Sequence, residues 1–162
     1  EFRSCWLAKS GIQTGVRETY HIVGEYHLTK DDITTPKAFP DTVAKGAHVI
    51  DIHEPDSIEQ TEFVYPKRAY NIPLKCLIPV GSVNLLTAGR SLSADGPGFG
   101  SARVMATCMA MGQGAGTAAA LCVRHGWTIG ELDTTVLRAT LIDQGAIVDI
   151  DHDAPIRSTI LT

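Results

Sequence analysis

The chain has 162 residues, enough to bury the core of one domain, and its 44% hydrophobic and 20% charged residues are typical of globular proteins. The chain contains 14 Lys and Arg residues and 18 Asp and Glu residues, so its formal charge is −4. Because the basic residues form no stripe along the sequence, we expect no nucleic-acid partner. The four cysteines form no C-x-x-C pair, so we expect no metal site and, from free thiols, a reducing cytoplasmic location.

The amino-terminal part of the chain predicts short extended elements. After Phe2, Trp6 and Leu7 are its core candidates, and the β-branched and aromatic residues of 16–29 predict one or two strands. Gly24 within them indicates a bulge or a close approach of two backbone segments. Thr29 is expected to cap a short helix that starts in the sequence TKDDI.

A short helix, a loop and several extended segments are predicted next. Residues 41–45 predict a helix that ends at Gly46, residues 49–53 a strand, and the polar residues 54–61 a surface loop. Residues 82–89 form a short apolar run that ends in glycine, which predicts a strand buried on both faces of a parallel sheet. The segment before this run is held extended by three prolines, Pro66, Pro73 and Pro79.

The sequence AGRSLSADGPGFGSARVM, at 88–105, predicts a glycine-rich loop that leads into a long helix over 102–125. The free N–H groups at the start of such a helix suit an anion or an electron-rich carbonyl, and the glycines would let a flat ligand approach. Ser101 is expected to cap this helix, and Arg103 adds a positive charge to its first turn. The alternative is a connecting loop with a solvated arginine.

The long helix carries no charge between Arg103 and Arg124 and contains the pair Gly112-x-x-x-Gly116. One interpretation is a membrane span with a dimerisation motif. We favour a packing helix and no membrane association, because small residues are placed on two opposite faces and large apolar residues are few. Such a helix is expected to be packed on both faces inside an α/β body.

Two helix starts and one strand are predicted after the long helix. Thr128 and Glu131 form a capping box, and Asp133 is expected to cap a helix over 134–144. Residues 146–150 predict a last strand.

Several segments resemble known family motifs. YNIPLKCLIP, NLLTAGR and SARVMATCMAMGQGAGTAAAL resemble Y-x-I-P-Y-R-C-L-x-P, N-L-L-V-A-G-R and S-x-R-V-M-x-T-C-M-A-x-G-Q-A-A-G-T-A-A-A-L. GVRETYHIVGEYHLT and AHVIDIHEP resemble the upstream motifs G-x-R-E-T-R-x-I-x-G-x-Y-x-L and Y-x-I-D-I-H-x-P. Over about residues 11–148, the chain therefore resembles the carboxy-terminal part of a bacterial family of FAD-dependent oxidoreductases.

This resemblance implies a glutathione-reductase-like FAD fold of the α/β class, or α+β for the fragment by itself. A strand, the glycine-rich loop and the long buried helix would return the chain to an FAD-binding domain. The implied division is a β-rich segment on the substrate side at 1–80, the carboxy-terminal part of the FAD-binding domain at 81–150, and a loose tail at 151–162.

The resemblance also implies an FAD site. Gly89 and Arg90 would lie near the ribitol or pyrophosphate of FAD. The flavin ring would be lined by a run of six residues, namely Gly100, Ser101, Ala102, Arg103, Val104 and Met105. Positive potential at the helix start would stabilise negative charge on the ring.

The catalytic candidates are Arg103 and His53. His53 is the acid–base candidate, because Asp95 and Gly96 stand where family members often carry a histidine. The alternative for His53 is a polar residue at a strand end, paired with Asp51 or Glu54. Arg17 and Glu18 could equally form a structural pair.

The motif G-x-G-x-x-G, which would hold the pyrophosphate, does not occur in the sequence. We therefore expect a fragment whose partner is a missing amino-terminal FAD domain, and which by itself binds FAD poorly and does not turn over its small-molecule substrate. The alternative is a stable non-catalytic domain that binds no FAD and forms a homo-oligomer.

Overall fold

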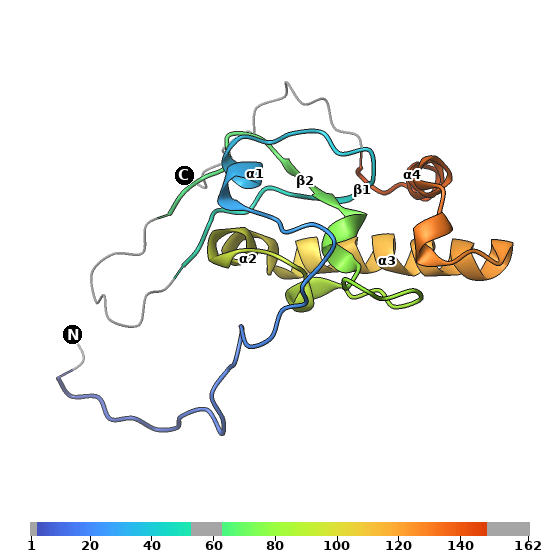
Figure 1. Cartoon of the computed structure of the whole chain (residues 1–162). Coiled ribbons are helices and arrows are strands. Elements are labelled where there is room, and N and C mark those ends of the chain that lie inside the picture. The colour runs from blue at the N-terminus through green and yellow to red at the C-terminus, as the bar shows by residue number, and fades with distance from the viewer. Residues whose placement is uncertain (1–2, 53–62, 149–162) are drawn as a thin grey trace.

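A long helix runs through the molecule, with a small sheet on one side and shorter helices around both (Figure 1). The computed structural model describes residues 3–52 and 63–148. The elements in chain order are α1 Lys30–Thr34, β1 Thr42–Gly46, β2 Tyr70–Pro73, η1 Leu74–Leu77, η2 Gly89–Ser91, α2 Gly96–Ala102, α3 Met105–His125, η3 Ile129–Glu131 and α4 Thr134–Asp143, where η denotes a short 3-10 helix. Helices and a two-stranded sheet together confirm the predicted mixed α/β class.

The sheet consists of β1 and β2 in antiparallel register, with Ala44 opposite Ile72 and Gly46 opposite Tyr70. The predicted helix at 41–45 is therefore wrong, since residues 42–45 belong to β1. The strand is almost wholly buried, which suits its β-branched start. A Cβ atom on Gly46 would overlap the Tyr70 ring, so this glycine permits strand pairing and does not end a helix.

The amino-terminal strands predicted at 16–29 are reduced to isolated bridges, the first between Gly24 and Pro79. The predicted close approach at Gly24 is confirmed, because a Cβ atom there would lie 2.7 Å from Cβ of Ser93. This glycine lets the amino-terminal segment lie against the chain that leads to α2.

Trp6 and Leu7 are not core residues, contrary to expectation, because their exposed fractions are 84% and 82%. All residues from 3 to 20 are exposed, and Figure 1 shows the first part of this stretch as an extended segment that leaves the body of the molecule. The core begins at Leu28.

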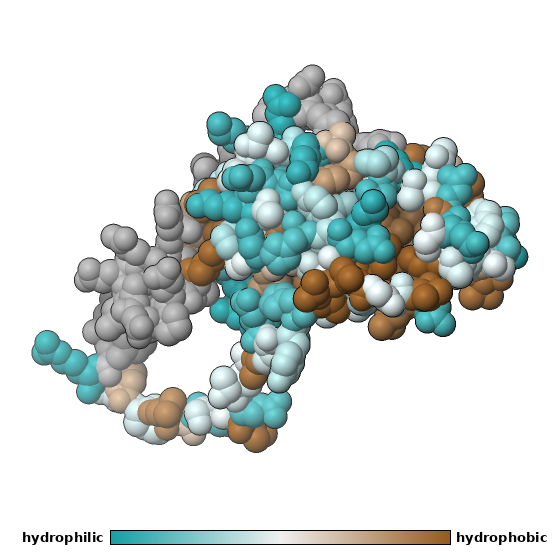
Figure 2. Space-filling view, in the orientation of Figure 1, coloured by the Kyte–Doolittle hydropathy of each residue, from teal (hydrophilic) through white to brown (hydrophobic). Residues whose placement is uncertain are grey.

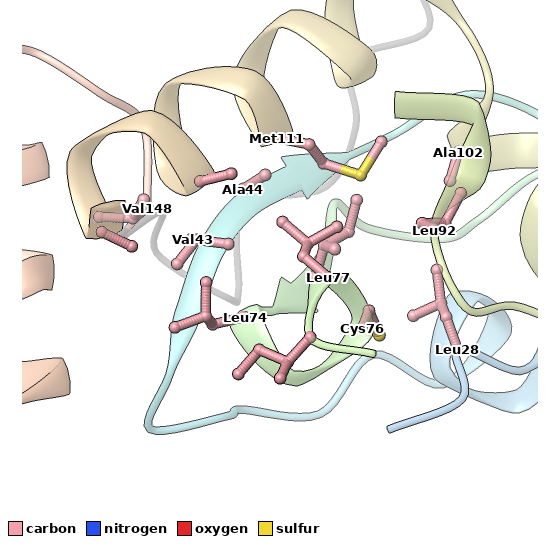
Figure 3. Close-up of a cluster of buried hydrophobic side chains, with 14 of the residues drawn as sticks. Leu28, Val43, Ala44, Leu74, Cys76, Leu77, Leu92, Ala102, Met111 and Val148 are labelled. Atoms are coloured by element: carbon pink, nitrogen blue, oxygen red, sulfur yellow. The ribbon is translucent and has the colours of Figure 1, made fainter. Parts of the chain in front are cut away.

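The core lies between α3, β1 and the turn that follows β2. Figure 3 shows Met111 of α3 above Val43 and Ala44 of β1 and Leu77 of η1. Gly114 of α3 is seated directly on β1, since a Cβ atom there would lie 2.7 Å from Cβ of Val43. Burial of these side chains provides the main stabilising term of the fold.

Only one face of α3 is packed by the described residues. Gly114 and Ala118 are buried, but Gly112 and Gly116 are exposed, and a Cβ atom on either would contact nothing within 4 Å. The expectation of two packed faces is therefore wrong for residues 3–52 and 63–148. No helix in these ranges combines the length and apolar character needed to cross a membrane.

The doubly buried strand predicted at 82–89 is not formed. Val83 and Leu85 are 63% and 55% exposed, and Figure 2 shows hydrophobic surface at the lower right, where this segment runs beside α3 in Figure 1. The described residues offer this run no strand to pair with. Instead, the backbone N–H of Thr87 donates to the carbonyl of Leu77 at 2.8 Å.

The predicted N-terminal caps of α1, η3 and α4 are confirmed. Thr29 and Asp32 form a capping box on α1, Thr128 and Glu131 form another on η3, and Asp133 caps α4. No strand is formed at 146–148, and the rest of that predicted strand, the loop 54–61 and the tail 151–162 lie outside the described residues.

Candidate functional site

The glycine-rich segment predicted as a loop contains a helix, α2, which leads directly into α3 (Figure 1). Asp95 caps it by accepting a hydrogen bond from the Gly98 N–H at 2.6 Å, and Pro97 suits the first turn. The second carboxylate oxygen of Asp95 accepts from the Lys30 N–H at 3.0 Å. Asp95 therefore fixes α2 to the start of α1. The glycine content of the segment gives no indication of this contact.

Ser101 lies inside α2 and does not cap α3, contrary to expectation. Its hydroxyl donates to the carbonyl of His48 at 2.5 Å and accepts from the Tyr70 hydroxyl at 2.8 Å. Burial raises the pKa of Tyr70 to about 12, so this tyrosine is a neutral donor. Ser101 thus joins α2 to the sheet, and the neighbouring Ala102 is fully buried.

The break between the two helices lies at Arg103 and Val104. Val104 is the N-cap residue of α3 and has no side-chain acceptor, so the first N–H groups of α3 lack a side-chain cap. The Arg103 guanidinium donates to the carbonyl of Asp51 at 2.9 Å and lies 3.4 Å from its carboxylate. The carboxylate offsets the unfavourable placement of a cation at a helix start.

A cavity of about 630 Å³ opens at this break, and we call it the arginine cleft. Its lining residues are Arg17, His48, Asp51, Arg90, Gly100, Arg103, Val104, Met105 and Cys108. Hydrogen-bond donors and positive charges thus surround a space large enough for a small organic ligand or one end of a cofactor.

The predicted cofactor residues fall into two groups. The cleft brings together five of them, Arg90, Gly100, Arg103, Val104 and Met105. Gly89 lies beside the cleft with φ +75°, and a Cβ atom there would be 3.7 Å from Cys108, whereas Ser101 and Ala102 face the core. His53 lies outside the described residues.

Four lining residues were absent from the predicted site, namely Arg17, His48, Asp51 and Cys108. Three of them belong to the two upstream segments that resemble family motifs, and this resemblance is the sequence feature that could have identified them as site residues. Glu18 contacts His21 at 3.2 Å, and no ion pair with Arg17 is found in the described part of the chain. Burial raises the pKa of the Cys108 thiol, so Cys108 is uncharged near neutral pH.

A second cavity of about 440 Å³ lies between β1, α3 and residues 145–147. Apart from Lys45 and Gln113, its lining side chains are apolar or absent. It offers few groups that could orient a polar ligand, so the arginine cleft is the better candidate site. Within residues 3–52 and 63–148, no three His, Cys, Asp or Glu residues are grouped to hold a metal ion.

Comparison with known proteins gives one family. The family described as FAD dependent oxidoreductase matches residues 1–141 of the 162 in the chain. No curated protein and no solved structure gives a significant match.

Proposed function

Because the chain belongs to the FAD dependent oxidoreductase family, we propose that it supplies the flavin-ring side of an FAD site in the arginine cleft. The observation that carries the proposal is the junction of α2 and α3, where uncapped N–H groups and the Arg103 guanidinium lie at one cavity. This donor set fits the electron-rich carbonyl end of a flavin ring.

FAD, when bound, supplies the two-electron chemistry of oxidoreductases. In our proposal, the N–H groups at the start of α3 and Arg103 stabilise negative charge at the ring. Asp51 is a positioning residue, since it holds the guanidinium at the helix break. Val104 and Met105 add apolar surface that would exclude water from the reacting end of the cleft.

We further propose that the adenine end of FAD is held by a different polypeptide segment, because the motif G-x-G-x-x-G does not occur in these 162 residues. In this proposal, residues 1–80 form the substrate side and residues 81–150 form the cofactor side, and both parts contribute to the lining of the arginine cleft. The substrate of the proposed reaction is a small molecule.

The proposal is tested by titrating the full chain with FMN and with FAD and measuring flavin fluorescence. Since only the ring end is held, the two dissociation constants should agree within about threefold. Arg103→Gln should weaken both by about tenfold or more, because a charged donor typically contributes 1.5–3 kcal/mol. Arg124→Gln is the matched control, since it removes the same charge from the exposed carboxyl-terminal turn of α3.

Two results would contradict the proposal. FAD binding about a hundredfold tighter than FMN binding would show that the chain also holds the adenine end. A folded chain that binds neither flavin would favour a non-catalytic domain without a cofactor site.

A further inference from the structure

Arg17 lies where three openings of the surface meet. It lines the arginine cleft of about 630 Å³ and two smaller cavities of about 200 and 170 Å³. Arg17 is exposed, so a ligand in the cleft can reach its guanidinium.

The lining of these cavities carries more positive than negative charge. Arg17, Arg90 and Arg103 face only two acidic residues, and both acids contact other groups. Asp51 pairs with Arg103 at 3.4 Å, and Glu18 contacts His21 at 3.2 Å. Within residues 3–52 and 63–148, no ion pair is found for Arg17 or Arg90. The surplus charge favours an anionic ligand.

The backbone next to Arg17 is fastened to η2. The Arg90 guanidinium donates to the carbonyl of Val16 at 2.9 Å, and the Ile22 N–H donates to the carbonyl of Ser91 at 3.1 Å. These contacts hold Arg17 beside the cleft even though the residues before it leave the body of the molecule (Figure 1). Arg90 is therefore a positioning residue for Arg17.

We propose that Arg17 binds a carboxylate of the substrate, so that the substrate is a small organic acid. The planar guanidinium can pair with both carboxylate oxygens, and Val104 and Met105 offer apolar surface to the carbon skeleton. The same guanidinium could hold a cofactor phosphate. We assign the substrate because residues 1–80 form the substrate side, and in this respect the inference rests on the proposed function.

The test titrates the ¹⁵N-labelled full chain, without flavin, with succinate and separately with inorganic pyrophosphate, and follows amide chemical shifts by NMR. Succinate should shift the amides of Gly100 and Cys108, which line the cleft. Arg17→Gln should weaken succinate binding at least tenfold. Arg17→Lys should weaken it less, since lysine keeps the positive charge but lacks the planar pair of N–H donors. Arg124→Gln should leave it within twofold of wild type.

Three results would overturn the inference: no response to succinate, an equal loss in Arg17→Gln and Arg124→Gln, or Arg17-dependent binding of pyrophosphate alone. The last would assign Arg17 to the cofactor. These titrations contain no flavin, so their outcome does not depend on flavin binding. A failure of flavin binding is detected by the separate fluorescence titration. Arg17 is exposed, so its variants should fold, which near-UV circular dichroism checks.

Discussion

Replacing Gly114 with alanine should lower the free energy of unfolding by about 1–3 kcal/mol, as overpacking of a core usually does. An alanine Cβ there would lie 2.7 Å from Cβ of Val43 and 3.1 Å from its backbone oxygen. Neither atom can move freely, because Val43 belongs to β1 in the core. Urea unfolding followed by circular dichroism measures the change.

Gly116→Ala is the matched control, since it lies on the exposed face of the same helix and a Cβ atom there contacts nothing within 4 Å. It should raise the free energy of unfolding by up to about 1 kcal/mol, because glycine is the poorer helix former. Equal effects of the two substitutions would contradict the packing of α3 on β1.

The sequence was sufficient to predict features that depend on a few neighbouring residues. The caps at Thr29 and Asp133 follow from one side chain and N–H groups two or three positions away. The end of α3 at Gly126 follows from its left-handed backbone, φ +69°, which glycine adopts without strain. Such interactions are decided locally and do not require knowledge of the rest of the fold.

The predictions that failed depended on distant residues. Gly46 resembled a helix end, but its space is needed by Tyr70, which lies 24 positions later. The apolar run at 82–89 resembled a buried strand, but the described residues provide no strand beside it. A pattern of side chains shows which face of a segment is apolar, and it does not show which other segment is available to cover it.

The candidate site was predictable only in part, because some of its residues come from segments that are distant in sequence. Five of its residues, from Arg90 to Met105, are close in sequence, and all of them except Gly100 belong to motifs that resemble a family. Arg17 and Asp51 come from earlier segments, and no local pattern indicates that they meet Arg103. Their positions in the site depend on contacts between distant segments, such as the hydrogen bond from Arg90 to the Val16 carbonyl.

Asp32→Asn should destabilise the chain by about 2 kcal/mol at pH 7, since hydrogen bonds to charged groups typically contribute 1.5–3 kcal/mol. Asp32 is buried and accepts hydrogen bonds from the Tyr26 hydroxyl at 3.0 Å and the Thr29 N–H at 2.9 Å. Lys37 lies 2.7 Å from its carboxylate. Asparagine keeps the shape but replaces one acceptor with a donor and removes the charge.

The pH dependence of unfolding separates the charge of Asp32 from its shape. Burial by itself would raise the pKa of Asp32, but Lys37 and the hydrogen-bond donors hold it below the ordinary value of 3.8. A carboxyl group whose pKa is lower in the folded state stabilises the fold above its unfolded pKa, and this contribution is lost as the pH falls below about 4. The stability difference between wild type and Asp32→Asn should therefore shrink between pH 5 and about pH 3. Asp31→Asn, on the exposed side of the same helix, should change stability by less than about 0.5 kcal/mol, and an equal effect of both substitutions would contradict this role of Asp32.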